Sequence, residues 1–300
     1  MVRILRFACG ALCILGSFAV ARGEGAVVLK SGPPLYVDSK GGPLRQPEGV
    51  GCGAGPMLAV ADTGNGRVLR FDVAQGKITP RDEIAVPQLP YPIRVRVDSR
   101  GEILALDGKL RRIARIDPSG RFGGYVEFPA SAGAVVPRSI ALGADDELYV
   151  LDILSARVVV VDRAGAVARE IAFPESHRSF SDLAVTPGGA VLLIDAVGRS
   201  VFAASPGDRA FSALTEGPVE STIFPTALAV DSTGRIYVAD QSSGDIVILG
   251  RDGSFLGQQS SMGWKPGFLR YPSGICADDR GNLFVADRGN NRVQVFAIVE

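Results

Sequence analysis

An apolar run that ends in Asp recurs six times along this 300-residue chain, and it constrains the fold more than any other feature. Successive copies are spaced by 45, 45, 43, 45 and 47 residues. A Pro, or Phe180 in the fourth copy, stands fifteen residues before each Asp, and a Val or Ile stands six residues after it. A repeat of this period indicates a fold built from similar packed units. The marker residues are Asp62, Asp107, Asp152, Asp195, Asp240 and Asp287.

Each copy contains short apolar runs separated by polar turns, as in residues 274–277, 283–286 and 292–296 of the last copy. These runs are rich in β-branched and aromatic residues and too short for helices, so they are predicted to be antiparallel strands. A looser fourth strand follows most copies, as in residues 210–214 after the fourth. This pattern is typical of a propeller blade, so we expect an all-β, six-bladed β-propeller of four-stranded antiparallel blades. The predicted units are about residues 46–86, 91–129, 136–174, 179–217, 224–260 and 271–300.

The last unit contains only three strands, whereas residues 25–31 form a strand-like run with no partner nearby in sequence. We therefore expect this N-terminal strand to complete the last blade and close the ring. Closure leaves fewer exposed sheet edges. Residues 22–300 would then form a single propeller domain.

The first 21 residues have the layout of a secretory signal peptide. Arg3 and Arg6 precede an uncharged apolar run over residues 7–20, which ends in the small-x-small site 19–21. The run is shorter than the roughly 20 residues that span a bilayer as a helix. We expect cleavage near Ala21 and an extracytoplasmic protein, either periplasmic or secreted. An uncleaved anchor is the alternative.

Cleavage at that site would leave two cysteines, Cys52 and Cys276. When the units are aligned on their Pro residues, these cysteines fall one position apart on the inner strands of blades one and six. Those blades are neighbours in a closed ring, and the side chains could either face one another or point apart. A disulfide also needs Cα atoms within about 7 Å. The sequence alone is compatible with a disulfide between these cysteines and with two free thiols.

The recurring Asp residues are interpreted as structural. A carboxylate at the end of a strand can accept hydrogen bonds from the backbone of the following turn. An Arg five residues later can reach back to it. A ring of calcium ligands is the alternative interpretation. The Arg recurs as Arg67, Arg112, Arg157 and Arg292.

The last copy resembles the NHL repeat. It reads Pro-x-Gly-Ile-x-x-Asp, then Gly-Asn-Leu-Phe-Val-Ala-Asp, then Gly-Asn-Asn-Arg-Val-Gln-Val-Phe. The resemblance extends over residues 26–300, with units one, five and six matching well and unit four least. It implies a six-bladed propeller, and such propellers mostly act as binding scaffolds. Some similar propellers are lyases or lactonases, so the resemblance alone does not identify a ligand.

Binding residues are predicted where the loops that precede the inner strands meet the central channel. Arg96 stands where the other units carry small residues, so it needs a carboxylate between blades or an anionic ligand that it shares with Arg94. Arg292 is placed among the exposed turn residues, and Trp264 is expected to be half-buried in its linker. The candidate binding residues are Glu48, Arg94, Arg96, Arg138, Asp182, Arg288, Asn290 and Asn291.

Composition argues against several chemistries. Acidic and basic residues balance at 32 each, so no bulk field favours nucleic acid or an anionic membrane. His177 is the single His, read as an exposed loop residue, and it cannot build a His-rich zinc site. No Cys-x-x-Cys-His haem motif is present. We assign no catalytic or metal-binding residue and expect no cofactor, although Glu48 and Asp182 leave a calcium site open.

The sequence therefore favours an exported, non-enzymatic module that binds or scaffolds a protein or glycan partner through its loops. The alternative is a calcium-dependent or other metal-dependent hydrolase, lactonase or lyase that acts at the channel mouth.

Overall fold

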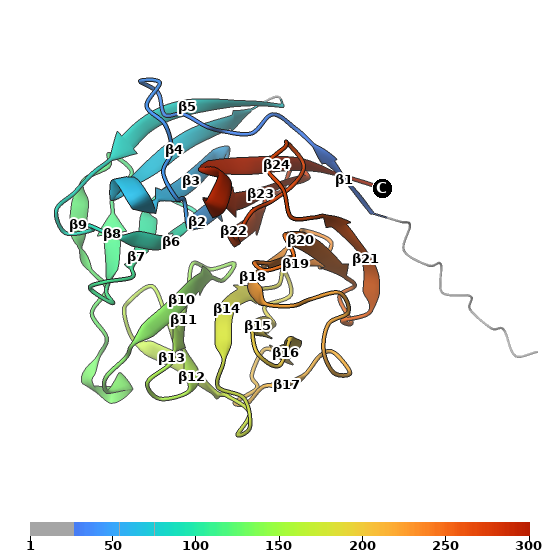
Figure 1. The fold of residues 1–300 in the computed structure, drawn as a ribbon. Helices are drawn as coiled ribbons and strands as arrows, with labels where there is room; N and C mark the ends of the chain where they lie inside the picture. The colour runs from blue at the N-terminus through green and yellow to red at the C-terminus, as the bar shows by residue number, and fades with distance from the viewer. Residues whose placement is uncertain (1–26, 54, 75) are drawn as a thin grey trace, which may run out of the picture.

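The computed structural model describes residues 27–53, 55–74 and 76–300. In this part of the chain, strands β1 to β24 form six four-stranded antiparallel sheets around a central axis (Figure 1). The prediction of an all-β, six-bladed propeller is confirmed. The expected signal peptide lies outside the described residues. Within them, no helix has the length and apolar character needed to cross a membrane.

Each blade is a meander in which the first strand lines the channel and the fourth lies outermost. Blades one to three contain β2 (Gly49–Cys52), β3 (Met57–Asp62), β4 (Arg67–Ala74) and β5 (Lys77–Ile84); β6 (Pro92–Val97), β7 (Ile103–Asp107), β8 (Ile113–Ile116) and β9 (Phe122–Tyr125); and β10 (Pro137–Leu142), β11 (Leu148–Asp152), β12 (Arg157–Val161) and β13 (Val167–Ala172).

The remaining blades follow the same order, and short 3-10 turns connect some strands. These elements are β14 (Phe180–Val185), β15 (Val191–Asp195), β16 (Ser200–Ala204) and β17 (Ser212–Ala213); β18 (Pro225–Val230), β19 (Ile236–Asp240), β20 (Asp245–Leu249) and β21 (Phe255–Ser260); β22 (Pro272–Ala277), β23 (Asn282–Asp287), β24 (Arg292–Val299) and β1 (Val28–Ser31); and η1 (Thr63–Asn65), η2 (Ala130–Ala132) and η3 (Arg288–Asn290).

The outer strand of blade four is shorter than the predicted run 210–214. Strand β17 has two residues, because the segment before it pairs with the neighbouring blade instead. The N–H of Ala172 in β13 donates to Arg209, and Ala172 forms a parallel bridge with Ala210. This competing pairing accounts for the short outer strand of blade four.

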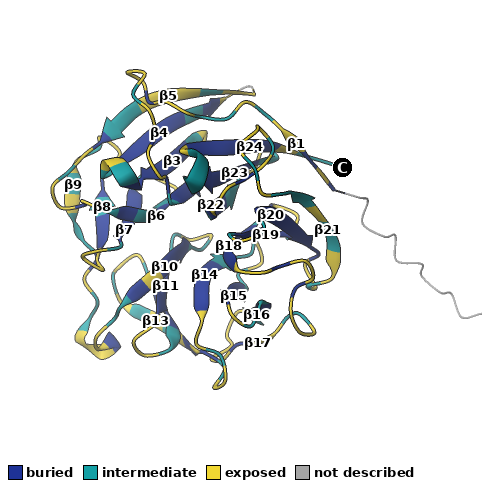
Figure 2. Ribbon diagram, in the orientation of Figure 1, coloured by how far each residue is buried: buried dark blue, intermediate teal, exposed yellow. Residues whose placement is uncertain are grey.

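Blades are joined by apolar side chains on both sheet faces. Between blades one and two, Val68 packs with Val95, Ile103 and Ile116, all essentially excluded from solvent. Burial of such a side chain contributes about 1.5–3 kcal/mol. The inner and middle strands are accordingly the most buried, while outer strands such as β5 and β21 are more exposed (Figure 2). Each blade therefore needs a neighbour on either side to exclude both of its sheet faces from solvent.

Inner strands of adjacent blades run side by side in the same direction. A Cβ at Gly49 would meet the Ile93 carbonyl oxygen at 2.7 Å, and one at Gly51 would meet that of Val95 at 2.5 Å. Only glycine permits this approach. All six blades therefore present the same ends to the same side of the ring.

Two faces of the ring follow from this shared direction. The first residue of each inner strand pairs with, or lies beside, the marker Asp that ends the second strand, as in Pro92 with Asp107. The loops before the inner strands and the turns after the marker Asp residues thus share one side, here called the loop face. It comprises residues 43–48, 63–66, 88–91, 108–112, 129–136, 153–156, 174–179, 196–199, 217–224, 241–244, 261–271 and 288–291. The opposite side, the far face, includes turns 98–102, 143–147, 186–190, 231–235 and 278–282.

The N-terminal strand closes the ring as predicted. Strand β1 pairs antiparallel with β24, from Val28 opposite Val299 to Ser31 opposite Phe296 (Figure 1). The neighbouring blade also holds β1. The N–H of Leu29 donates to Gln259 Oε1 at 2.6 Å, and Gln259 Nε2 donates to the carbonyl of Val27 at the same distance. The first and last strands of the described chain thus share one blade.

A disulfide joins Cys52 of β2 to Cys276 of β22, with Cα atoms 5.8 Å apart. Of the two orientations that the sequence left open, the structure has the one in which the thiols face each other. Blades one and six are consequently linked at the channel by a covalent bond, and blade six itself is completed on the outside by β1.

Candidate functional site

The marker Asp residues are buried and hold the loops of the loop face. The carboxylate of Asp62 accepts the N–H of Arg45, and that of Asp287 accepts the N–H of Arg270, both at 2.7 Å. These partners lie in the loop before the inner strand of the same blade. The same contact links Asp107 to Tyr91, Asp152 to Val136, and Asp240 to Ile223 and Phe224.

The bonds expected from the following turn are present in four blades. Asp107, Asp152, Asp195 and Asp240 each accept one or two backbone N–H groups of that turn. In blade one the turn instead supplies the side-chain amide of Asn65. Blade six uses Asn290 in the same way.

The Arg that follows five residues after the marker behaves differently from blade to blade. Arg67 and Arg157 reach back to Asp62 and Asp152, at 2.8 and 3.2 Å. Arg112 does not reach back. It pairs with Glu127 at 2.7 Å, and its guanidinium lies over the Tyr125 ring, because backbone N–H groups already occupy Asp107.

In blade four, the loop before the inner strand contacts the marker Asp195 through the side chain of His177. The interpretation of His177 as an exposed loop residue is therefore wrong. Its Nδ1 lies 2.7 Å from Asp195 Oδ2, and its ring packs against Phe202 with centroids 4.6 Å apart. The side chain is about one-third exposed. His177 thus anchors its loop to the marker Asp where the other blades use a backbone N–H.

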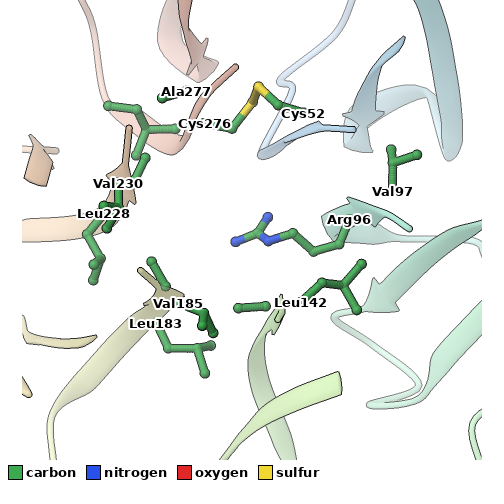
Figure 3. Close-up of a pocket in the computed structure, with 14 residues that line it drawn as sticks. Cys52, Arg96, Val97, Leu142, Leu183, Val185, Leu228, Val230, Cys276 and Ala277 are labelled. Carbon is green, nitrogen blue, oxygen red and sulfur yellow. A yellow bond between two sulfur atoms is a disulfide. The ribbon is translucent and has the colours of Figure 1, made fainter. Parts of the chain in front are cut away.

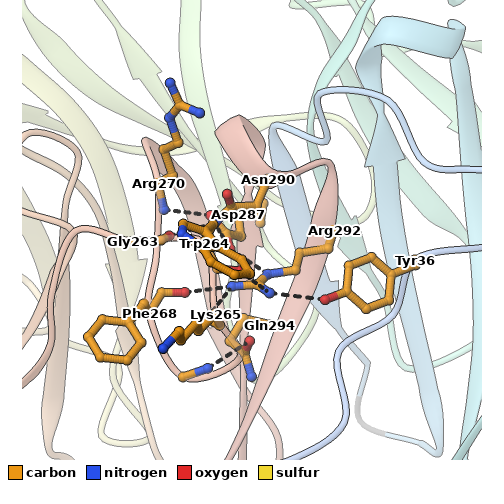
Figure 4. Close-up of polar contacts among 12 residues, drawn as sticks. Tyr36, Gly263, Trp264, Lys265, Phe268, Arg270, Asp287, Asn290, Arg292 and Gln294 are labelled. Carbon is orange, nitrogen blue, oxygen red and sulfur yellow. Dashed lines mark hydrogen bonds and ion pairs between the residues drawn. The ribbon is translucent and has the colours of Figure 1, made fainter.

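Arg292 is buried, contrary to its expected exposure, with 1% of its side chain accessible. Figure 4 shows its guanidinium enclosed by the linker before blade six. It donates to Asp287 at 2.7 Å, to the carbonyls of Trp264 and Phe268 at 3.0 and 2.7 Å, and to the hydroxyl of Tyr36 at 3.0 Å. One cation thereby fixes the linker to the blade.

Trp264 is not half-buried as expected, since 74% of it is exposed. Its carbonyl faces Arg292, and this holds the backbone while the indole lies outside. In the described residues, most exposed large apolar side chains belong to the loop face. They are Leu110, Ile153, Leu154, Val197, Ile223, Phe224, Met262, Trp264, Phe268 and Tyr271.

Basic side chains lie among these apolar groups. Lys109 stands over the Tyr91 ring at 4.7 Å, and Arg270 over Tyr271 at 5.7 Å. Other exposed basic residues of the loop face are Arg45, Arg111, Arg112, Arg178 and Lys265, and Arg138 adjoins this face at the start of β10. The far-face turns are different in kind, because short polar Asp-capped reversals such as 98–102 and 278–282 form them.

The structure brings Arg94 and Asp182 together across the channel, with Nε 3.7 Å from Oδ1. Both side chains are buried. The Asp182 carboxylate also accepts the hydroxyl of Ser139 and the N–H of Leu228. Arg94 Nη1 donates to the carbonyl of Ile93 at 3.0 Å, while its buried Nε has no hydrogen-bond partner in the described part of the chain.

Glu48 and Arg138 lie nearer the loop-face mouth. Glu48 faces Arg288 at 3.5 Å and the hydroxyl of Tyr91 at 3.4 Å, and its negative charge raises the pKa of Tyr91. The Arg138 side chain is exposed, yet partial desolvation and repulsion from Arg94 lower its pKa. The mouth of the channel is thus more basic than acidic.

The two predicted Asn residues serve the loops themselves. Asn290 donates to the carbonyl of Gly263 at 2.9 Å and to Asp287 at 2.8 Å. Asn291 adopts a φ of +52° and accepts the N–H of Gln46 at 2.8 Å. Arg96 lies farther along the channel, toward the far face, where it donates to the carbonyls of Val50 and Val95. The carboxylate expected beside Arg96 faces Arg94 instead.

Within residues 27–53, 55–74 and 76–300, no group of three or more His, Cys, Asp or Glu side chains is arranged to hold a metal ion.

Sequence comparison finds the NHL repeat family model matching residues 269–296. NHL repeat-containing protein 3 of Homo sapiens is 36% identical over 75 residues, which are 24% of this chain and 22% of that protein. Protein lin-41 of Caenorhabditis elegans is 40% identical over 72 residues, 24% of this chain and 5% of that protein. The match therefore spans about a fifth, or less, of the length of these relatives.

Structure comparison finds propellers that cover nearly the whole chain. A streptogramin B lyase superposes with a TM-score of 0.63 at 13% identity, covering 91% of this chain and 98% of the lyase. The gluconolactonase XC5397 of Xanthomonas campestris gives 0.63 at 15% identity, covering 93% and 99%. At these identities the likeness shows a shared fold alone.

Proposed function

We propose that this six-bladed β-propeller, whose residues 269–296 match the NHL repeat family model, is an exported, non-enzymatic scaffold that binds a protein partner through its loop face. The observation that carries this proposal is the sorting of side chains between the two faces. Most exposed large apolar side chains of the described residues lie on the loop face, whereas the far-face turns are short and polar. Contiguous apolar surface bordered by polar residues is typical of interaction sites.

The composition of the loop face suits a protein interface. Trp, Tyr and Arg side chains are the most frequent anchors of protein–protein binding. Trp264, Val197 and Ile223 are 74%, 70% and 62% exposed. The exposed charges around them are mainly basic, so the partner surface is expected to combine acidic groups with apolar pockets.

The buried polar network keeps this surface in place before a partner arrives. Asp240 accepts the N–H groups of both Ile223 and Phe224, at 2.6 and 2.7 Å, and so fixes the backbone that presents their side chains. Arg292 does the same for the linker that carries Trp264. Loops ordered in advance lose less entropy on binding. The repeated Asp thereby supports recognition without touching the partner.

Export is supported by the signal-peptide layout of residues 1–21. A disulfide between Cys52 and Cys276 also suits an oxidising compartment. The lyase and gluconolactonase share the fold at 13% and 15% identity, which supplies no reason to transfer their activities.

The test is capture of partners from the extracytoplasmic fraction of the native cell, quantified by mass spectrometry. The bait comprises residues 22–300, with Trp264→Ser and Arg138→Glu as loop-face variants. Arg100→Glu, on an exposed far-face turn, is the matched control. We expect a reproducible protein partner that the loop-face variants lose and the control retains. Capture that survives both loop-face changes, or that the control loses equally, would contradict the proposal. Capture abolished by periodate but not by protease would assign a glycan instead.

A further inference from the structure

A cavity of about 210 Å³ lies in the channel between the inner strands (Figure 3). Its outer ring consists of the residues that end the inner strands, among them Val97, Leu142, Val185 and Val230. The cavity therefore sits at the far-face end of the channel, away from the proposed partner surface. Its volume is below the roughly 300–1,000 Å³ of sites for drug-sized ligands, so it suits a small molecule.

One cation stands among uncharged side chains in the wall of this cavity. Arg96 stands at the position where the other inner strands carry Gly51, Ala141, Ala184, Ala229 and Cys276. Figure 3 shows its guanidinium extending into the cavity, with the disulfide and Leu183 on other sides. Among the residues that line this cavity, Arg96 is the only one with a charged side chain.

The hydrogen-bonding capacity of Arg96 is only partly used. Nη1 donates to the carbonyls of Val95 and Val50, at 2.8 and 3.3 Å. No ion pair to Arg96 is formed among the described residues. A guanidinium has five N–H donors in a fork that matches a carboxylate. Donors of Arg96 therefore remain for a molecule in the cavity.

The charges along the channel do not balance. Arg94, Arg96 and Arg138 face one buried carboxylate, that of Asp182, while Glu48 is engaged by Arg288. Burial lowers the pKa of Arg96 and repulsion from Arg94 adds to this, while the Asp182 carboxylate opposes the shift. Arginine nevertheless stays protonated in proteins. An anion beside Arg96 would offset a desolvated charge that the protein compensates only in part.

We propose that this cavity binds a small organic monoanion, namely a monocarboxylate with a short aliphatic body. The carboxylate would accept hydrogen bonds from Arg96, and the aliphatic body would lie against Leu142, Val185 and Val230, which are partly accessible where they line the cavity. Inorganic phosphate fits less well, because one guanidinium offsets the charge of a monocarboxylate but only part of the charge of a phosphate dianion. The site is separate from the loop face, so it does not depend on the proposed partner binding.

The test is calorimetric titration of residues 22–300 with hexanoate, 1-hexanol and inorganic phosphate. We expect hexanoate to bind, and to bind more tightly than either comparison compound. Arg96→Gln should weaken hexanoate binding about tenfold or more. Arg112→Gln, in an exposed pair with Glu127 outside the channel, should leave it unchanged. Equal hexanoate affinity in wild type and Arg96→Gln would overturn the proposal, as would phosphate binding as tight as that of hexanoate.

A second measurement covers the case in which Arg96→Gln does not fold. In wild-type protein, NMR should show contacts between hexanoate methylene protons and the methyl groups of Leu142 and Val185, and Leu142→Trp should abolish binding by filling the cavity. Contacts confined to other methyl groups, or binding that persists in Leu142→Trp, would place the ligand elsewhere and overturn the assignment.

Discussion

Asp287 and Arg292 form an enclosed ion pair, with Oδ2 and Nε 2.7 Å apart and 0% and 1% of their side chains exposed. Arg292→Leu removes the only charged partner of that carboxylate among the described residues, which keeps the N–H of Arg270 and the amide of Asn290, and it leaves several linker carbonyls without this donor. Removal of one partner from a buried pair costs about 3–5 kcal/mol, and we expect a loss of this size in the free energy of unfolding measured with urea.

The repeat offers a matched control for this prediction. Arg112 occupies the equivalent place in blade two, where its ion pair with Glu127 is exposed. Exposed pairs contribute about 0–1 kcal/mol, so Arg112→Leu should change stability little. Equal losses in the two variants would show that the burial of Arg292 is not what stabilises blade six.

Strand β1 provides a second prediction. Leu29 is 8% exposed and packs between blades five and six, whereas its neighbour Val28 is 46% exposed. Leu29→Ala should therefore lower the free energy of unfolding by about 2 kcal/mol or more, and Val28→Ala by about 0.5 kcal/mol or less. Deletion of residues 22–32 should lower the melting temperature of the whole domain. An unchanged melting temperature for the truncated protein would contradict ring closure by β1.

The disulfide between Cys52 and Cys276 provides a third prediction. It joins residues separated by 224 positions, so the unfolded chain gains much freedom when it is removed. A Cys52→Ser, Cys276→Ser double variant should lose about 2–5 kcal/mol under oxidising conditions. Reductant should bring the wild type to the same stability and leave the variant unaffected. Two titratable thiols in the unreduced protein of residues 22–300 would contradict the bond.

The architecture could be predicted because each blade is specified locally. Alternating apolar residues and turn residues recur at fixed offsets, and a four-stranded unit of this size must pack against copies of itself. The closing strand was predictable for the same reason, since the last unit lacked one strand. The outer strand of blade four was overestimated because Ala172 of the neighbouring blade competes for its backbone.

The environments of single side chains were harder to predict. The loop partner of Asp287 is the N–H of Arg270, seventeen residues earlier. An argument from the sequence that considers only donors in the turn after Asp287 does not identify this hydrogen bond. Arg292 seemed exposed because nothing in sequence shows that the linker carbonyls turn inward, and Trp264 seemed packed for the same reason. The position of Arg96 was visible as a charge among small residues, but the cavity around it depends on five other blades.

The pair Arg70–Asp82 predicts a pH dependence. The hydrogen bond from Arg70 lowers the pKa of Asp82 below its ordinary value of 3.8, although partial burial opposes this. The unfolded chain then takes up this proton at higher pH than the folded one. The stabilising contribution is thus complete above the ordinary pKa and is lost as pH falls through the lowered value.

Thermal unfolding between pH 7 and pH 2 should show this behaviour. Asp82→Asn should be less stable than wild type at pH 7, and the difference should shrink as the pH falls. Asp72→Asn is the control, because Asp72 lies 3.8 Å from Arg81 in a half-exposed pair. A difference that stays constant down to pH 2 would contradict the assignment.

Site-specific photo-crosslinking in the native cell tests the loop-face proposal most directly. Benzoylphenylalanine would replace Leu154 or Val197, which are 58% and 70% exposed on the loop face, or Ser232, which is exposed on the far face. We predict that the two loop-face positions crosslink the same protein and that Ser232 does not. Crosslinks of equal yield from Ser232, or none from Leu154 and Val197, would contradict the proposal that this propeller binds its partner through the loop face.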